Sequence, residues 1–212
     1  MTGFLLVLGG AVVLFVAYAA YTLRRVNTPT TGPPIDRAAR PETALVVIDV
    51  QEDFAGDKAG WDPACRDARL DAIRSAVAEA RERGEPVLTV RHAFRHPLLR
   101  FVIRLVAGGR GIVGSKGLGL LPALDIAADA DVLKHESDSL SAPAFERWLA
   151  DNRVGALVLV GLDGCHCVQN TANGALNRGY AVRILPDGVL AHNEAGWQRH
   201  RERLAARGAV VA

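Results

Sequence analysis

The sequence has little cysteine and little net charge. Its 212 residues include three cysteines, Cys65, Cys165 and Cys167, whose odd number and wide spacing form no disulfide framework. That pattern fits a reducing compartment. The net charge of +2 gives no indication of nucleic-acid binding. With 50% hydrophobic residues, the chain is long enough for one α/β domain with a substantial core.

Charged side chains are absent from residues 3–21. As a helix that rises 1.5 Å per residue, this stretch covers roughly 28 Å, about the hydrocarbon thickness of a bilayer. Tyr18 and Tyr21 occupy positions typical of an interfacial aromatic belt. We therefore expect a single transmembrane anchor within residues 1–25.

The residues that follow indicate the orientation of this anchor. Arg24 and Arg25 come next, and the positive-inside rule places them and the following domain in the cytoplasm. Residues 26–43 are polar and rich in proline, which is typical of a semi-extended linker. The alternative is a signal peptide cleaved after residues 17–19, but the positively charged segment that should precede it is missing.

From residue 44 onward, apolar runs alternate with helical patterns. The apolar runs are typical of buried strands and cover residues 44–50, 86–92, 131–136, 155–162, 181–187 and 209–212. Helical periodicity covers residues 65–84, 141–155, 166–180 and 193–208, and Ser141 has the residue type of an N-cap. This alternation predicts one α/β domain over residues 44–212, with a doubly wound, mostly parallel, Rossmann-like sheet and helices on both faces.

Three polar residues stand at predicted strand ends. Asp49 ends the first strand, Lys134 the third, and Cys167 opens the helix after the fourth. Sites in such sheets form at the carboxyl ends of strands, so we expect the three to converge. A helix N-terminus and an ammonium lower a thiol pKa, and a carboxylate can accept the thiol proton. Taken singly, the residues have ordinary interpretations: a loop-capping carboxylate, a solvated lysine and a small buried thiol.

Three segments resemble the isochorismatase-like cysteine hydrolases, a superfamily that includes nicotinamidase and N-carbamoylsarcosine amidase. Residues 46–54, VVIDVQEDF, resemble its D-x-Q-x-D-F opening, and residues 131–149 resemble its lysine segment. Residues 157–189 resemble its cysteine segment, usually G-x-A-T-x-x-C-V followed by T-A and later G-Y. The resemblance covers roughly residues 44–212 and implies an isochorismatase-like fold.

The resemblance also implies roles for individual residues. Asp49 matches the general base, Lys134 the lysine of the triad, and Cys167 the nucleophile, since it lies six residues after Gly161. It further implies a non-proline cis peptide between Leu162 and Asp163, and an oxyanion hole formed by the backbone N–H groups of Asp163 and Cys167.

The chain departs from the motif at two places. Asp163 and Gly164 replace the usual Ala-Thr, and a carboxylate close to the thiol would oppose thiolate formation. Cys165 is interpreted as a small filler or as a transient redox partner of Cys167, since a zinc site at these two thiols lacks a second pair of ligands. Residues 55–74 contain no histidine where nicotinamidases bind a metal, so we expect neither a metal nor another cofactor.

Acidic residues are absent between residues 86 and 124. Within this stretch, His96, Arg100 and Arg104 are spaced by four among apolar residues, which predicts a basic amphipathic insertion at about residues 94–120. Such a helix can lie on an anionic membrane through residues 91–106. A lid over the active site and an oligomer contact are the alternatives.

These expectations combine into a metal-independent, membrane-tethered cysteine hydrolase. It would cleave the C–N bond of a small amide through an acyl-enzyme, with Phe54, Trp61 and His135 as candidates to line the substrate pocket. The alternative is a catalytically weak domain that binds a small ligand or a protein partner at the membrane. The resemblance also favours a homo-oligomer.

Overall fold

The computed structural model describes the backbone of residues 2–212 and the side chains from residue 13 onward. Its elements in chain order are α1 (Thr2–Val26), β1 (Glu42–Ile48), α2 (Glu52–Ala55), η1 (Asp57–Ala59), α3 (Pro63–Glu82), β2 (Val87–His92), α4 (Pro97–Ala107), η2 (Lys116–Leu118), η3 (Pro122–Leu124), β3 (Ala130–Lys134), η4 (Ser139–Ser141), α5 (Pro143–Asp151), β4 (Val154–Leu162), η5 (Gly164–Val168), α6 (Gln169–Asn177), β5 (Ala181–Leu190), α7 (Glu194–Ala206) and β6 (Val210–Val211). The strands predicted from the apolar runs all form.

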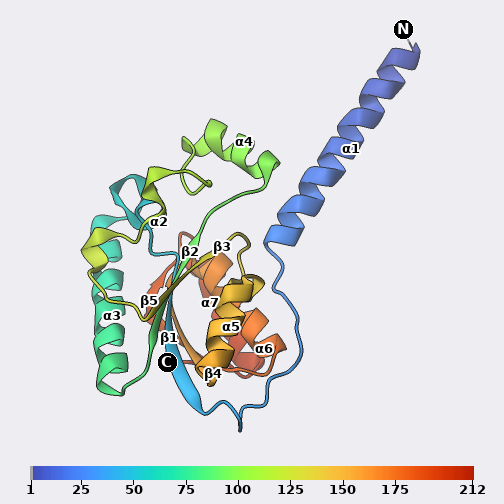
Figure 1. Cartoon of the computed structure of the whole chain (residues 1–212). Helices are drawn as coiled ribbons and strands as arrows, with labels where there is room; N and C mark the ends of the chain where they lie inside the picture. The colour runs from blue at the N-terminus through green and yellow to red at the C-terminus, as the bar shows by residue number, and fades with distance from the viewer. Residues whose placement is uncertain (1) are drawn as a thin grey trace.

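The strands build one parallel sheet in the order β3-β2-β1-β4-β5-β6. The chain moves outward from β1 through β2 to β3, and then returns to the other side of β1 with β4 (Figure 1). Strand order therefore reverses between β1 and β4, and a crevice at the carboxyl ends of these two strands is where such sheets bind ligands. The predicted doubly wound α/β sheet is confirmed.

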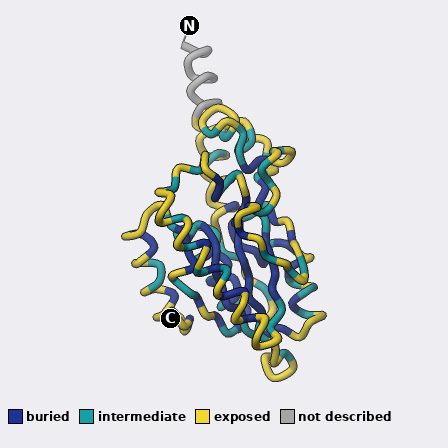
Figure 2. Tube along the Cα trace, turned by 90° about the vertical axis from the view of Figure 1, so that its left-hand side faces the viewer, coloured by how far each residue is buried: buried dark blue, intermediate teal, exposed yellow. Residues whose placement is uncertain are grey.

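Helices cover both faces of the sheet, as Figure 1 shows. On one face α3 packs Leu70, Ile73 and Val77 against alternate residues of β1. On the other face lie α5, α6 and α7, whose Phe145 and Trp197 are almost fully buried. The strands form the buried interior in Figure 2, and the outer faces of the helices are exposed. Burial on both sides explains why β1 and β4 read as continuous apolar runs rather than as alternating ones.

One predicted helix start is wrong. Ser141 does not cap α5, because Ala142 holds that position and Pro143 is the first helical residue. Ser141 instead ends the short 3-10 turn η4, where its hydroxyl donates to the Asp138 carbonyl at 2.6 Å.

The N-terminal helix α1 projects from the domain (Figure 1). Among the residues whose side chains are described, no helix is long and apolar enough to cross a membrane. More than half of the anchor predicted at residues 3–21 falls on residues 3–12, whose side chains lie outside the described part of the chain.

The segment after α1, residues 27–35, is fixed to the domain and is called the strap below. The Thr30 backbone N–H and hydroxyl both donate to Asp138 Oδ2, at 2.7 and 2.6 Å. The Ile35 N–H donates to the Arg178 carbonyl at 2.8 Å, and Arg178 in turn donates to the Thr30 carbonyl at 3.2 Å. This part of the expected linker is therefore extended but not a free spacer.

Candidate active site

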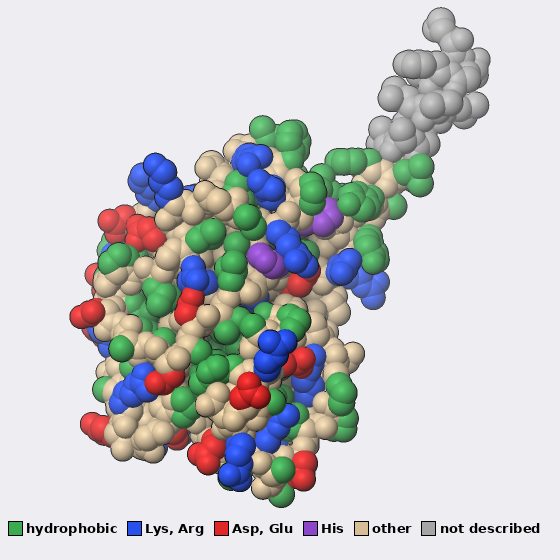
Figure 3. All heavy atoms as spheres, viewed as in Figure 1, with side chains coloured by type: hydrophobic (Ala, Val, Ile, Leu, Met, Phe, Trp, Pro, Cys, Tyr) green, Lys and Arg blue, Asp and Glu red, His purple; other side chains and the backbone are tan. Residues whose placement is uncertain are grey.

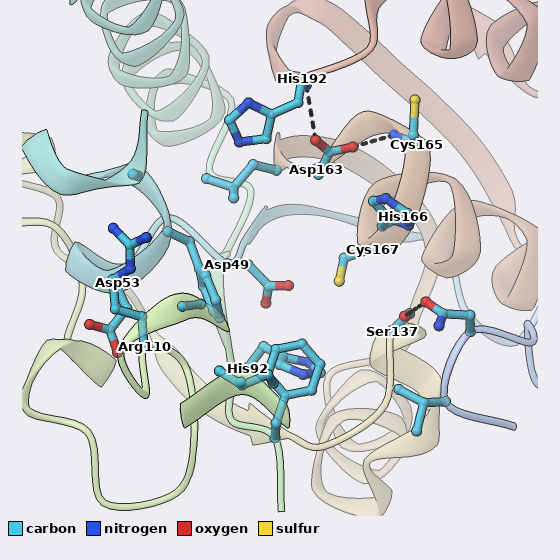
Figure 4. Close-up of a pocket in the computed structure, with 18 of the residues that line it drawn as sticks. Asp49, Asp53, His92, Arg110, Ser137, Asp163, Cys165, His166, Cys167 and His192 are labelled. Atoms are coloured by element: carbon cyan, nitrogen blue, oxygen red, sulfur yellow. Dashed lines mark hydrogen bonds between the residues drawn. The ribbon is translucent and has the colours of Figure 1, made fainter. Parts of the chain in front are cut away.

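Asp49, Lys134 and Cys167 converge at the carboxyl edge of the sheet (Figure 4 labels Asp49 and Cys167). Asp49 directly follows β1, and Cys167 lies in the turn after β4. Lys134 ends β3, two strands away from β1, and its ammonium lies 2.9 Å from Asp49 Oδ2. A carboxylate oxygen of Asp49 lies within 4.8 Å of Cys167 Sγ. The structure thus brings together the three residues that the sequence motifs indicated.

Lys134 and Asp49 form a buried ion pair, with exposed side-chain fractions of 0% and 3%. Burial raises the pKa of Asp49, and the Lys134 cation opposes that rise. Burial is the largest single influence on the pKa of Lys134 and lowers it, but Asp49 and Cys167 together outweigh this effect, and the pKa rises. Lys134 is therefore a permanent cation at neutral pH, beside a carboxylate that is a stronger base than an exposed one.

Cys167 is a neutral thiol in the resting protein. Burial raises the pKa of Cys167 well above its ordinary value, the Asp49 carboxylate raises it further, and Lys134 opposes both. The expected lowering of this pKa is wrong, because the start of the helix is buried and faces a negative charge. Asp49 Oδ1 is buried and accepts no hydrogen bond among the described residues. An available proton acceptor thus lies next to the thiol (Figure 4).

The backbone at this edge needs particular residues. Asp49 has a φ of 56°, a left-handed conformation that is uncommon outside glycine and often found at functional sites. Gly161 has a φ of 117°, and a Cβ there would lie 2.1 Å from the Ile48 carbonyl oxygen. Only glycine lets the end of β4 approach β1 this closely, so that the next turn carries Cys167 toward Asp49.

The turn between β4 and η5 begins with a cis peptide between Leu162 and Asp163. The Asp163 carboxylate accepts hydrogen bonds from the backbone N–H of Cys165 at 2.7 Å and of His192 at 3.0 Å. It therefore caps the turn, and Figure 4 shows it directed toward these groups rather than at the Cys167 sulfur. The backbone N–H groups of Asp163 and Cys167, expected to form an oxyanion hole, belong to this same turn.

Cys165 has a separate environment. Its thiol donates to the Asn193 carbonyl at 3.3 Å, and its sulfur points away from that of Cys167 in Figure 4. Burial raises the pKa of Cys165. These contacts favour the filler interpretation over a redox partner.

The sequence profile of the isochorismatase domain family matches residues 43–212, which hold the sheet and all three converging residues. The chain belongs to the isochorismatase family. It is 27% identical over 182 residues to the nicotinamidase of Escherichia coli strain K12, an alignment that covers 72% of this chain and 85% of the relative.

Solved structures agree with this family assignment. The N-carbamoylsarcosine amidase of Thermoplasma acidophilum superposes with a TM-score of 0.68 at 26% identity, covering 80% of this chain and 95% of that one. The pyrazinamidase of Pyrococcus horikoshii in complex with zinc gives a TM-score of 0.68 at 23% identity over 81% and 99% of the two chains, a likeness of fold.

In this isochorismatase-family domain, a cavity of about 590 Å³ opens beside Asp49 and Cys167. Phe54 and Trp61 line it, as expected, but His135 does not. The His135 Nδ1 lies 2.7 Å from the Ala93 carbonyl, and the side chain lines a separate depression. His135 points there because Lys134, its neighbour on the chain, takes the inward direction, and successive strand residues alternate sides.

Sequence reasoning missed His92. It ends β2 and lies opposite Lys134 in the sheet register. Its Nδ1 lies 3.3 Å from the Lys134 ammonium, which can only donate, so the ring proton is assigned to Nε2. Burial, then the Lys134 charge, lowers the pKa of His92 well below its ordinary value. The signal was its place at the end of the strand 86–92, the criterion that selected Asp49 and Lys134.

A resident metal fits this constellation poorly, although Asp49, His92 and Cys167 each offer an atom within 4.8 Å of the others. The Lys134 ammonium lies 2.9 Å from Asp49 Oδ2 and 3.3 Å from His92 Nδ1, so it already occupies one carboxylate oxygen and one ring nitrogen that a metal could use. A second cation beside it would be repelled strongly at this depth. Lys134 supplies the positive charge of the site.

Proposed function

We propose that this protein is a cysteine amidohydrolase that cleaves the C–N bond of an amide, with Cys167 as nucleophile and Asp49 as base. The observation that carries the proposal is a half-buried thiol beside a buried carboxylate at the wall of one cavity, with a buried ammonium paired to that carboxylate. Structural ion pairs alone do not require a thiol or an open cavity, whereas nucleophilic catalysis requires both. Similarity to a nicotinamidase and to an N-carbamoylsarcosine amidase supports the same bond type.

The charges account for the proton movements. In the resting protein the charges of Lys134 and Asp49 cancel, and the Cys167 thiol is neutral. When a substrate carbonyl reaches Cys167, the thiol proton moves to Asp49, and the new thiolate is balanced by Lys134. Sulfur attacks the carbonyl carbon, the C–N bond breaks, and Asp49 returns the proton to the leaving nitrogen. Water, deprotonated by Asp49, then attacks the thioester carbonyl, the C–S bond breaks to release the acid, and Asp49 returns the proton to the Cys167 sulfur.

Backbone groups and His92 complete the proposed site. The N–H groups of Asp163 and Cys167 would stabilise the oxyanion that forms during attack. His92 stays neutral because of its lowered pKa, and its Nδ1 accepts from Lys134, which keeps the ammonium directed at Asp49. We assign it a positioning role.

The rival is a ligand-binding domain with little activity, suggested by Asp163-Gly164 in place of the usual Ala-Thr. The capping role of Asp163 weakens that argument, since its carboxylate is held by two N–H groups. The deciding experiment incubates the full-length protein with a panel of small amides and acid-quenches it for mass spectrometry. We expect a mass adduct on Cys167 that is absent in Cys167→Ala and retained in Cys165→Ala. Ligand binding without an adduct or released acid would favour the rival.

We further propose that α1 anchors the protein in a membrane with the domain in the cytoplasm. The uncharged residues 3–21 and the following Arg24 and Arg25 support this proposal. A variant lacking residues 2–18 should leave the membrane pellet on alkaline carbonate extraction, whereas the full-length chain should remain there. Extraction of both forms alike would contradict the anchor.

A second, weaker membrane contact is proposed for residues 91–106. The variant lacking residues 2–18 should bind anionic vesicles at low salt and be released as the Debye length shrinks. Arg100→Glu with Arg104→Glu should abolish that binding, and the same vesicles made from neutral lipids serve as control. If the truncated protein does not bind anionic vesicles, the second membrane contact is wrong and the segment is a lid or an oligomer contact.

A further inference from the structure

The cavity extends from Asp49 and Cys167 to the N-terminal helix and to α4. Most of its wall there is apolar, and we call this part the apolar chamber; it is lined by Leu23, Val26, Phe94, Leu99, Val102 and Ile103. The last turn of α1 and the inner face of α4 thus form part of the active-site wall. The Tyr18 hydroxyl of α1 and Nε2 of His96, the residue that precedes α4, lie 3.1 Å apart and join the two helices.

Several polar groups of the cavity wall already have protein partners. Asp53 Oδ2 accepts from the Gly111 N–H at 2.7 Å and from the Ser115 hydroxyl. Asn27 Oδ1 accepts from the Ser137 hydroxyl at 2.9 Å. The six residues of the chamber itself have no hydrogen-bonding side-chain groups, so the chamber recognises surface that needs no hydrogen bonds.

The size of the cavity exceeds what a small amide fills. A volume of about 590 Å³ lies in the range that holds drug-sized ligands, whereas the reacting amide needs only the part beside Cys167. Figure 3 shows hydrophobic and basic side chains side by side over α4, and Phe101, Leu105 and Val106 there are exposed by 61%, 71% and 77%. Apolar surface therefore continues outward from the chamber along the same helix.

We propose that the substrate is an amide that carries an apolar chain, and that this chain lies in the apolar chamber between α1 and α4. The proposal rests on the amidohydrolase function above and names its substrate class. The apolar chain of the substrate is attached either to the acyl side or to the amine side of the C–N bond. In both cases the chamber would bind it through apolar contacts. A second copy of the protein covering α4 is the competing occupant.

The test compares two series of amides with the full-length protein in mild detergent, each used below its solubility limit. One series runs from acetamide to octanamide, and the other from N-methylacetamide to N-octylacetamide. Each methylene that enters an apolar site should raise kcat/KM about fourfold. We expect kcat/KM to rise at least a hundredfold along one of the two series, and then to level off when the chamber is full.

Two valines with equal exposure provide a matched pair. Val102 lines the chamber and Val113 does not, and their exposed fractions are 42% and 41%. Val102→Glu should lower the ratio of octyl-substrate to short-substrate kcat/KM at least tenfold, because it places a carboxylate beside the chain. Val113→Glu adds the same charge and should leave that ratio unchanged.

Calorimetry with Cys167→Ala separates this proposal from the catalytic one. If short amides are cleaved but kcat/KM does not change with chain length in either series, the proposal of an apolar substrate chain is wrong and the hydrolase function stands. If no amide is cleaved but octyl compounds bind Cys167→Ala at least a hundredfold more tightly than short ones, the hydrolase function fails and the chamber assignment stands. Neither cleavage nor chain-dependent binding overturns both.

Discussion

Replacing Lys134 by methionine removes the buried cation beside Asp49 but keeps a side chain of similar length. Both partners are almost completely buried, and removing one member of such a pair typically costs about 3–5 kcal/mol, because the other charge is left without compensation. The free energy of unfolding should therefore fall by about that amount at neutral pH.

The loss of unfolding free energy in Lys134→Met should depend on pH, and the direction of this dependence follows from the pKa of Asp49. In the unfolded chain this carboxyl ionises near its ordinary value of 3.8, and its pKa in the folded protein is raised. A raised carboxyl pKa contributes stability below the unfolded value and loses it as the pH rises toward the folded pKa, by at most about 1.4 kcal/mol per pH unit. Without Lys134 the folded pKa of Asp49 rises further. The stability difference between wild type and Lys134→Met should thus widen as the pH rises from the folded pKa of Asp49 in wild type toward its higher value in the variant, by at most about 1.4 kcal/mol per pH unit.

Urea unfolding of the full-length protein, followed by circular dichroism at several pH values, measures this difference. The double variant Asp49→Asn with Lys134→Met has neither titrating group of the pair, so the difference between Lys134→Met and this double variant should carry the pH dependence of the Asp49 carboxyl. An equal loss in Lys134→Met at pH 4.5 and 7.5, or the same pH dependence in the double variant, would refute the coupling.

Three further outcomes follow from the site. Iodoacetamide near neutral pH should label exposed Cys65 faster than Cys167 in the ligand-free protein, because the raised pKa keeps Cys167 as a thiol. Peptide mass spectrometry gives the two labelling rates, and faster labelling of Cys167 would contradict the neutral resting state. Gly161→Ala should lower the free energy of unfolding in urea by about 2–6 kcal/mol, since the new Cβ would lie 2.1 Å from the Ile48 carbonyl oxygen at a φ of 117°. A loss under 1 kcal/mol would mean that the ends of β1 and β4 are not so close. Asp163→Ala should cost about 1–2 kcal/mol, while Asp163→Asn, which keeps the capping oxygen, should cost less; equal losses would argue against the cap.

Most of the fold could be predicted because burial on both faces leaves a strong local signal. The continuous apolar runs of β1 and β4 identified the central strands, and the helical periodicity identified α3. Strand β5 runs on to Leu190, beyond the predicted end at residue 187, because Val189 and Leu190 pair with the end of β4 after a register shift. Pairing of that kind depends on a distant strand, so the local sequence does not show where β5 ends.

The site could be predicted as a set of residues but not as a charge distribution. Asp49, Lys134 and Cys167 could be selected because the strand ends and the motif spacing can both be read from the sequence alone. The direction of the Cys167 pKa shift depends on how deeply the turn is buried and on which side of it Asp49 lies, and neither is written in the spacing. The walls supplied by α1 and α4 were also hidden, since segments far apart in the sequence meet there.

The strap also decides where a shortened version of this protein can safely start. The family match begins at residue 43, which invites expression of the domain from that point. Such a cut would leave Asp138 Oδ2 without the two donors of Thr30, and Asn170 without the Asn27 carbonyl to which it donates at 3.0 Å. It would also uncover the Ser137 N–H, which donates to the Val26 carbonyl at 2.9 Å, while the Ser137 carbonyl accepts from Lys134 at 3.2 Å. A fragment for crystallisation or screening should therefore begin within α1, ahead of buried Thr22, so that the lysine of the site keeps its neighbours.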